Sequence, residues 1–158
     1  VLMLMDSGGS MEYYSHLCSM LFQAARQSNH FKELHVYYFH NCIYSSVYTN
    51  PRMWREHAVS TDWILQNYGS DYKVILVGYE LMEKRYDSRS GEVRYSGMDQ
   101  INRFRAHYDH LIWLNPEEPP RYRGYWGESY FHIEKAVDMF PLTVDGLERG
   151  MKKLLVNR

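Results

Sequence analysis

The chain opens with an unbroken apolar run, Val1 to Met5, which is followed at once by an acid, two glycines and a serine in the sequence VLMLMDSGGS. A short run without polar interruption is typical of a strand that is buried on both faces, as inside a parallel sheet. The glycines permit a tight backbone path, and Ser10 can cap a helix that we expect over 11–28. Asp6 is therefore predicted at the carboxyl end of a buried strand, where open α/β sheets bind their ligands.

Two kinds of ligand suit this arrangement. Backbone N–H groups at a helix start favour an anion such as phosphate, whereas a carboxylate with neighbouring hydroxyl oxygens favours a hard cation, typically Mg²⁺. We favour the cation, because the negative charge of Asp6 repels phosphate unless a metal lies between them. The alternative, that Asp6 and Ser10 only cap the helix, stays open because caps of this type are common.

Composition limits the class of protein. A length of 158 residues suits one domain, and a hydrophobic content of 45% indicates a globular chain. The net charge of −1 gives no global attraction to nucleic acid or to an anionic membrane. Two cysteines make no disulfide framework, and without a membrane-spanning run or signal peptide we expect a cytoplasmic protein. Because the chain starts at a strand residue other than Met, we expect residues 1–158 to be a single domain from a longer protein.

Apolar runs alternate with amphipathic stretches along the rest of the chain. We expect strands at 1–5, 34–39, 43–48, 73–78, 109–114 and 137–140, and further helices at 60–68, 98–108 and 143–156. The residues expected on buried helix faces are Leu17, Met20, Leu21, Ala24 and Ala25, and then Val144, Leu147, Met151, Leu154 and Leu155. Polar loops are expected over 81–97, with the basic residues Lys84, Arg85, Arg89 and Arg94, and over 117–127. The alternation predicts a doubly wound, mostly parallel α/β sheet with helices on both faces, in which 43–48 is the one antiparallel edge strand.

Polar residues follow several of the predicted strands. His40 and Asn41 come after the second strand, Tyr79 and Glu80 after 73–78, and Asn115 after 109–114. Because parallel strands bring their carboxyl ends to one edge of the sheet, we expect a partner-binding rim of His40, Asn41, Tyr79 and Asn115 beside Asp6. A zinc pair from His40 and Cys42 is disfavoured, since the sequence offers no second ligand pair at the usual spacing.

With these motifs, the chain resembles a von Willebrand factor A (VWA) domain, and it is most similar to bacterial VWA domains of the CoxE-like group. The metal-ion-dependent adhesion site (MIDAS) of that family begins with Asp-x-Ser-x-Ser after the first strand, and the corresponding stretch here is Asp6-Ser7-Gly8-Gly9-Ser10. The family adds a threonine before a later helix, which Thr61 matches, and an aspartate after the next strand. Phe39 and the closing segment FPLT at 140–143 also fit.

The resemblance implies an Mg²⁺ or Mn²⁺ site with Asp6, Ser10 and Thr61 as ligands and with Ser7, Gly8 and Glu80 as further positions. Two departures weaken this site. Gly8 replaces the middle serine and removes one hydroxyl ligand. Tyr79 stands at the position of the family's second aspartate, and a phenol is a poor Mg²⁺ ligand because it is protonated at neutral pH.

The resemblance also implies a non-catalytic, protein-binding function. In such a module an acidic residue of the partner completes the shell of the ion, and CoxE-like proteins are associated with AAA+ ATPases of the MoxR type. One alternative is a metal-free VWA scaffold that binds through apolar and aromatic loops. A less supported one is a metal-dependent hydrolase that uses Asp6. Ser7 or Ser10 could also act as a nucleophile with His40 as its base, although the sequence is not a Gly-x-Ser-x-Gly elbow.

Overall fold

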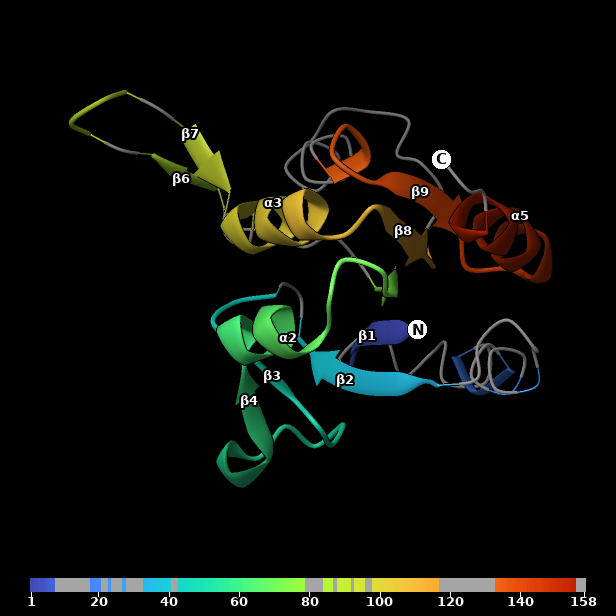
Figure 1. The fold of residues 1–158 in the computed structure, drawn as a ribbon. Coiled ribbons are helices and arrows are strands. Elements are labelled where there is room, and N and C mark those ends of the chain that lie inside the picture. Colours follow the sequence, from blue (N-terminus) through green and yellow to red (C-terminus); the bar gives the residue numbers. More distant parts are fainter. Residues whose placement is uncertain are drawn as a thin grey trace.

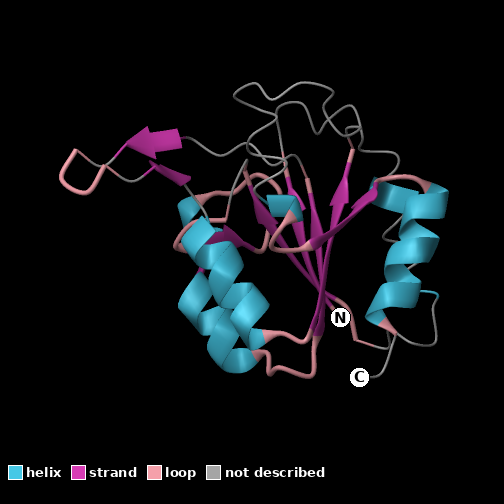
Figure 2. Cartoon of the chain, turned by 90° about the horizontal axis from the view of Figure 1, so that it is seen from above, coloured by secondary structure: helices cyan, strands magenta, loops and turns pink. Residues whose placement is uncertain are grey.

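The computed structural model describes residues 1–7, 18–20, 23, 27, 33–40, 43–78, 84–86, 88–91, 93–95, 98–116 and 133–155. Its centre is a seven-stranded sheet in the order β4-β3-β2-β1-β5-β8-β9, with helices on both sides (Figures 1 and 2). The strands of this sheet are β1 (Leu2–Asp6), β2 (His35–Phe39), β3 (Ser46–Tyr48), β4 (Ala58–Ser60), β5 (Lys73–Val77), β8 (His110–Asn115) and β9 (Asp138–Pro141).

Five neighbouring strands of the sheet, β2-β1-β5-β8-β9, are parallel, and β3 is antiparallel to both of its neighbours. The predicted fold class, a mostly parallel α/β sheet with helices on both faces, is confirmed and is Rossmann-like. The antiparallel strand is shorter than expected, since β3 begins at Ser46, and the short β4, which we did not expect, pairs along its outer side.

The strand β1 supplies both halves of the core. Leu2 and Leu4 pack on the face covered by α2 (Thr61–Asn67) and α3 (Met98–His107), whereas Met3 and Met5 pack on the face covered by α5 (Val144–Leu154). All four side chains are buried, as the unbroken apolar run predicts for a strand between two helical layers. Burial of each such side chain contributes about 1.5–3 kcal/mol to folding.

The predicted starts of two helices are confirmed, whereas two residues predicted on buried helix faces are exposed. Ser60 and Thr143 cap α2 and α5 as their sequences predict, each accepting a backbone N–H of the first turn. The face predictions are wrong at two positions, because Met20 is 43% exposed and Val144 is 61% exposed. Near Met20 it is Cys18 that packs into the core, while most of the predicted helix 11–28 lies outside the described residues.

A separate two-stranded sheet replaces part of the loop expected over 81–97. The strands β6 (Lys84–Tyr86) and β7 (Val93–Tyr95) pair antiparallel and project away from the main sheet (Figure 1). A further short element is the 3-10 helix η2 (Arg55–His57) before β4. In the part of the chain that the structure describes, no helix has the length and apolarity needed to cross a bilayer.

Candidate functional site

The carboxyl ends of the parallel strands place several of the predicted site residues at one edge. Asp6 pairs with Phe39, so that His40 follows at the end of β2. Val77 pairs with Leu114, so that Gly78, directly after β5, lies level with Asn115, the last residue of β8. Leu4, Leu76 and Trp113, each two residues earlier, belong to the core on the α2–α3 side. Because side chains alternate along a strand, Asp6, Gly78 and Asn115 share that face.

Asp6 is held against the backbone of β5. Its side chain is only 2% exposed, and a Cβ atom added at Gly78 would lie 2.5 Å from the Cβ atom and 3.2 Å from Oδ2 of Asp6. Gly78 is fixed in turn by its own hydrogen bonds, donating to the Leu114 carbonyl at 3.1 Å and accepting from the Trp113 indole at 2.8 Å. The space occupied by the Asp6 carboxylate therefore exists because residue 78 has no side chain.

Among the described residues, His40 is the basic side chain that lies nearest to Asp6. Its Nδ1 atom lies 3.6 Å from Asp6 Oδ1 and 3.0 Å from the Ser7 carbonyl oxygen. A carbonyl can only accept, so the contact with Ser7 requires the proton on Nδ1 and leaves Nε2 as the acceptor in the neutral ring. His40 is half exposed, which fits its predicted position on the rim.

Two hydroxyl groups near this edge are oriented by backbone carbonyls. The Ser7 hydroxyl donates to the Pro51 carbonyl at 2.8 Å, and the Ser7 backbone N–H donates to the Phe39 carbonyl. The hydroxyl of the buried Thr61 donates to the Tyr44 carbonyl at 2.6 Å. Each hydroxyl thus donates its single proton to a backbone carbonyl, and the lone pairs of its oxygen remain able to bind a cation.

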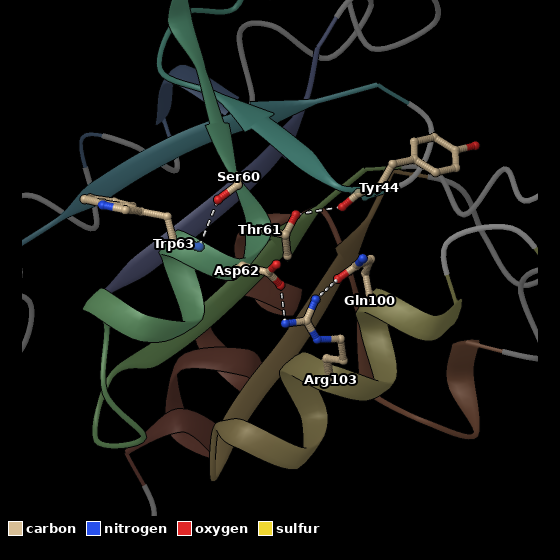
Figure 3. A network of polar contacts seen from close by, with 7 residues as sticks. All are labelled: Tyr44, Ser60, Thr61, Asp62, Trp63, Gln100 and Arg103. Atoms are coloured by element: carbon tan, nitrogen blue, oxygen red, sulfur yellow. Dashed lines mark hydrogen bonds and ion pairs between the residues drawn. The ribbon is translucent and has the colours of Figure 1, made fainter.

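Thr61 is held at the start of α2 by contacts on both sides (Figure 3). Its backbone N–H donates to the Ser45 carbonyl, in the segment between β2 and β3. Next to it, Asp62 pairs with Arg103 of α3, whose guanidinium also donates to Gln100. Because Ser60 pairs with Ser46, at the end of β3 that adjoins His40, Thr61 lies at the same edge of the sheet as Asp6, across β2 and β3.

Asn115 and Cys18 complete the described surroundings of the edge. Asn115 is buried, and its amide donates to the Met139 sulfur at 3.6 Å. Burial raises the pKa of the Cys18 thiol to about 11, with a further contribution from the negative charge of Asp6. The Cys18 thiol is therefore protonated at neutral pH and is not a nucleophile there.

The described residues contain only part of the predicted ligand set. Asp6, Ser7 and Thr61 are described, whereas Gly8, Ser10, Asn41, Tyr79 and Glu80 lie outside the described residues. Within the described ranges, no three His, Cys, Asp or Glu side chains gather closely enough to hold a metal ion. Sequence reasoning missed Gly78 and Pro51. The only sequence signal for Gly78 was a glycine directly after an apolar run.

No protein family, no curated protein and no solved structure matches the chain in comparisons of sequence and structure.

Proposed function

We propose that the chain is a non-catalytic protein-binding module of the VWA type, which engages a partner through the carboxyl edge of its sheet and uses a weakened Mg²⁺ or Mn²⁺ site there. One observation carries the proposal. A carboxylate ends the central strand β1, and the neighbouring strand β5 is followed by a glycine that makes room for it. The resemblance to VWA domains implies that a carboxylate in this position, Asp6, is a metal ligand.

The described donors have the chemistry that Mg²⁺ prefers. Asp6 offers carboxylate oxygens, and the hydroxyls of Ser7 and Thr61 have their protons directed to backbone carbonyls. Hard oxygen ligands with retained water suit Mg²⁺ and Mn²⁺. Ser10, and Glu80 as a further position, would extend this set. A bound ion would supply an open coordination position for a carboxylate of the partner.

The partner class follows from the same resemblance. An acidic residue on the surface of a protein partner would complete the shell of the ion, and the AAA+ ATPases of the MoxR type are the partners we propose. The half-exposed His40 would flank the contact, together with Asn41 and Tyr79. The prediction of Asn115 as a rim residue is wrong, because its side chain is buried and turned toward Met139. Specificity would then come from the loops at this edge, as is usual for sites placed on a rigid scaffold.

Calorimetric titration with Mg²⁺ and with Mn²⁺ tests the metal site directly. We expect heat of binding for the unaltered chain and none for Asp6→Asn, which keeps the shape of the side chain but removes its charge. The matched control is Asp71→Asn, because Asp71 is an exposed acid on the turn before β5, at the other end of the sheet. Equal binding by the unaltered chain and Asp6→Asn ends the metal version of the proposal.

A metal-free VWA scaffold is the second candidate, and the contact between Asp6 and His40 favours it. The Nδ1 atom of His40 lies 3.6 Å from Asp6 Oδ1, so the chain itself supplies a polar neighbour for the buried carboxylate. Thermal unfolding separates the two candidates. An ion that binds only the folded chain raises its melting temperature, so unchanged melting in Mg²⁺ and in a chelator supports the metal-free scaffold.

A hydrolase has less support from the geometry. The Ser7 hydroxyl donates to the Pro51 carbonyl, and His40 contacts the Ser7 carbonyl rather than the hydroxyl. A nucleophile and its base are expected within hydrogen-bond reach of one another. We therefore propose binding rather than catalysis for this edge.

A further inference from the structure

A second surface lies on the segment that joins β3 to β4. We define the Trp54 surface as Arg52, Trp54, Arg55 and His57. Trp54 is 53% exposed, and both arginines are exposed as well. A tryptophan exposed to this degree keeps most of an aromatic ring in water, which is more often found at interaction sites than elsewhere on a surface.

The segment that carries Trp54 is fixed by its own hydrogen bonds. Asn50 accepts the Arg52 N–H with its side chain and the Met53 N–H with its carbonyl, and His57 is bonded back to Trp54 and to Thr49. Met53 has a φ of +56°, a left-handed conformation that costs a non-glycine residue about 1–2 kcal/mol. The chain therefore holds Trp54 outward in a defined, partly strained turn, so that little ordering is needed when a ligand binds.

The charges around Trp54 have one predominant sign. The Arg52 guanidinium lies over the indole ring, 5.5 Å from its centroid, and the His57 ring stacks on the indole at 6.4 Å. Neither Arg52 nor Arg55 forms an ion pair with a described residue. The one acid in the segment is Glu56, whose carboxylate lies 4.0 Å from His57 Nε2. Two guanidinium groups without an ion pair in the described part of the chain, on the segment that carries an exposed indole, are complementary to carboxylates that alternate with apolar side chains.

We propose that the Trp54 surface binds an extended acidic segment of a protein partner. A polypeptide fits better than a nucleic acid, because η2 leads directly into β4, the outermost strand of the sheet on this side, and an outer strand offers backbone groups to an extended chain. The net charge of −1 also disfavours a long polyanion.

This inference rests on the proposed function, since it assigns a second contact to the same binding module. The two surfaces are physically joined, because the Ser7 hydroxyl at the carboxyl edge donates to the carbonyl of Pro51, next to Arg52. The acidic partner proposed for the metal edge can therefore reach both surfaces. Binding at the Trp54 surface itself involves no metal.

Selection from a random dodecapeptide library displayed on phage tests the proposal with the full chain. We expect enrichment of Asp- and Glu-rich peptides. The affinity of the selected peptide, measured by fluorescence anisotropy, is expected to fall at least about tenfold in Trp54→Ala and in Arg52→Gln/Arg55→Gln, and to weaken as salt is raised. Enrichment of neutral or basic peptides, or unchanged affinity in both variants, overturns the proposal.

Two matched control variants test whether a loss of peptide binding is specific to the Trp54 surface. Trp63→Ala removes another exposed tryptophan, 44% exposed on α2, and Arg149→Gln removes another arginine that lies over an aromatic ring, that of Phe140. Both are expected to bind the peptide as the unaltered chain does, and a loss as large as in Trp54→Ala overturns the proposal. The proposal is also overturned if the chain binds a single-stranded thymidine oligonucleotide more tightly than the peptide. Peptide binding that persists in a chelator and in Asp6→Asn upholds the Trp54 surface even where the metal titration fails.

Discussion

Replacing Gly78 by alanine tests the contact on which the carboxyl-edge site depends. The new Cβ atom would meet Asp6 Cβ at 2.5 Å, well inside the 3.4 Å at which ordinary contact begins. Neither Cβ atom can rotate away, because each is bonded directly to the backbone, that of Asp6 in β1 and that of residue 78 at the end of β5. Overpacking of this kind costs about 1–3 kcal/mol, and the φ of +155° at Gly78 adds strain for any L side chain.

We expect Gly78→Ala to lower the free energy of unfolding by about 2 kcal/mol, which corresponds to a fall in melting temperature of about 4–8 °C for a domain of this size. Urea denaturation followed by circular dichroism gives the free energy, and the slope with urea concentration should stay unchanged. The matched control is Gly69→Ala. Its Cβ would approach only Asp71 Oδ1, at 2.9 Å, and the end of an exposed side chain can move aside.

A double-mutant cycle separates the clash with Asp6 from backbone strain at Gly78. In an Asp6→Gly background the Cβ atom that clashes is gone, so Gly78→Ala should cost at least about 1 kcal/mol less than it does alone. An alanine at position 78 that leaves stability unchanged refutes the close contact. Equal costs in the two backgrounds refute its attribution to Asp6.

Two further expectations concern titrating groups. In a Cys42→Ser background, alkylation of Cys18 by iodoacetamide should be slow at pH 7.5 and its rate should rise toward pH 11, since burial and the charge of Asp6 raise the pKa of the thiol to about 11. Asp6→Asn should lower the pH at which the rate is half-maximal, and an unchanged midpoint would contradict the influence of Asp6. Burial, together with the hydrogen bond to Tyr37, raises the pKa of Tyr68 above its usual value of 10. The folded chain therefore holds this proton more tightly than the unfolded chain, so stability is complete below pH 10 and is lost as the pH rises beyond it; Tyr68→Phe should lessen that alkaline loss, and an equal loss would contradict the role of Tyr68.

The sequence predicts the strands and helix starts well because their causes are local. Leu2–Asp6 forms a buried strand because its first four side chains are apolar. Ser60 and Thr143 cap helices because each side chain reaches a backbone N–H three residues ahead. Helix faces are less certain. Val144 is the first residue of α5 and its apolar side chain is exposed, although the spacing puts it in line with Leu147.

The site is less predictable than the fold because its contacts join distant segments. Asp6 could be placed at a strand end from its own neighbours, but its contact with Gly78 depends on the register of β1 against β5. The hydrogen bond from Ser7 to Pro51 spans 44 positions and involves a backbone oxygen, which no residue pattern encodes. The strand β4 was missed for a related reason, since Ala58–Ser60 becomes a strand only by pairing with β3.

Binding at the Trp54 surface can compensate for weak binding at the proposed metal site in the total free energy of partner binding. Gly8 and Tyr79 remove one hydroxyl and one charge from the ligand set of the family that the chain resembles, so a carboxylate bound at the ion alone would be held loosely. Once a partner is bound at one of the two surfaces, its contact with the other becomes intramolecular, at an effective concentration on the order of millimolar. Two weak contacts would then give useful affinity without a complete metal shell, because the hydrogen bond between Ser7 and Pro51 already joins the two segments before the partner binds.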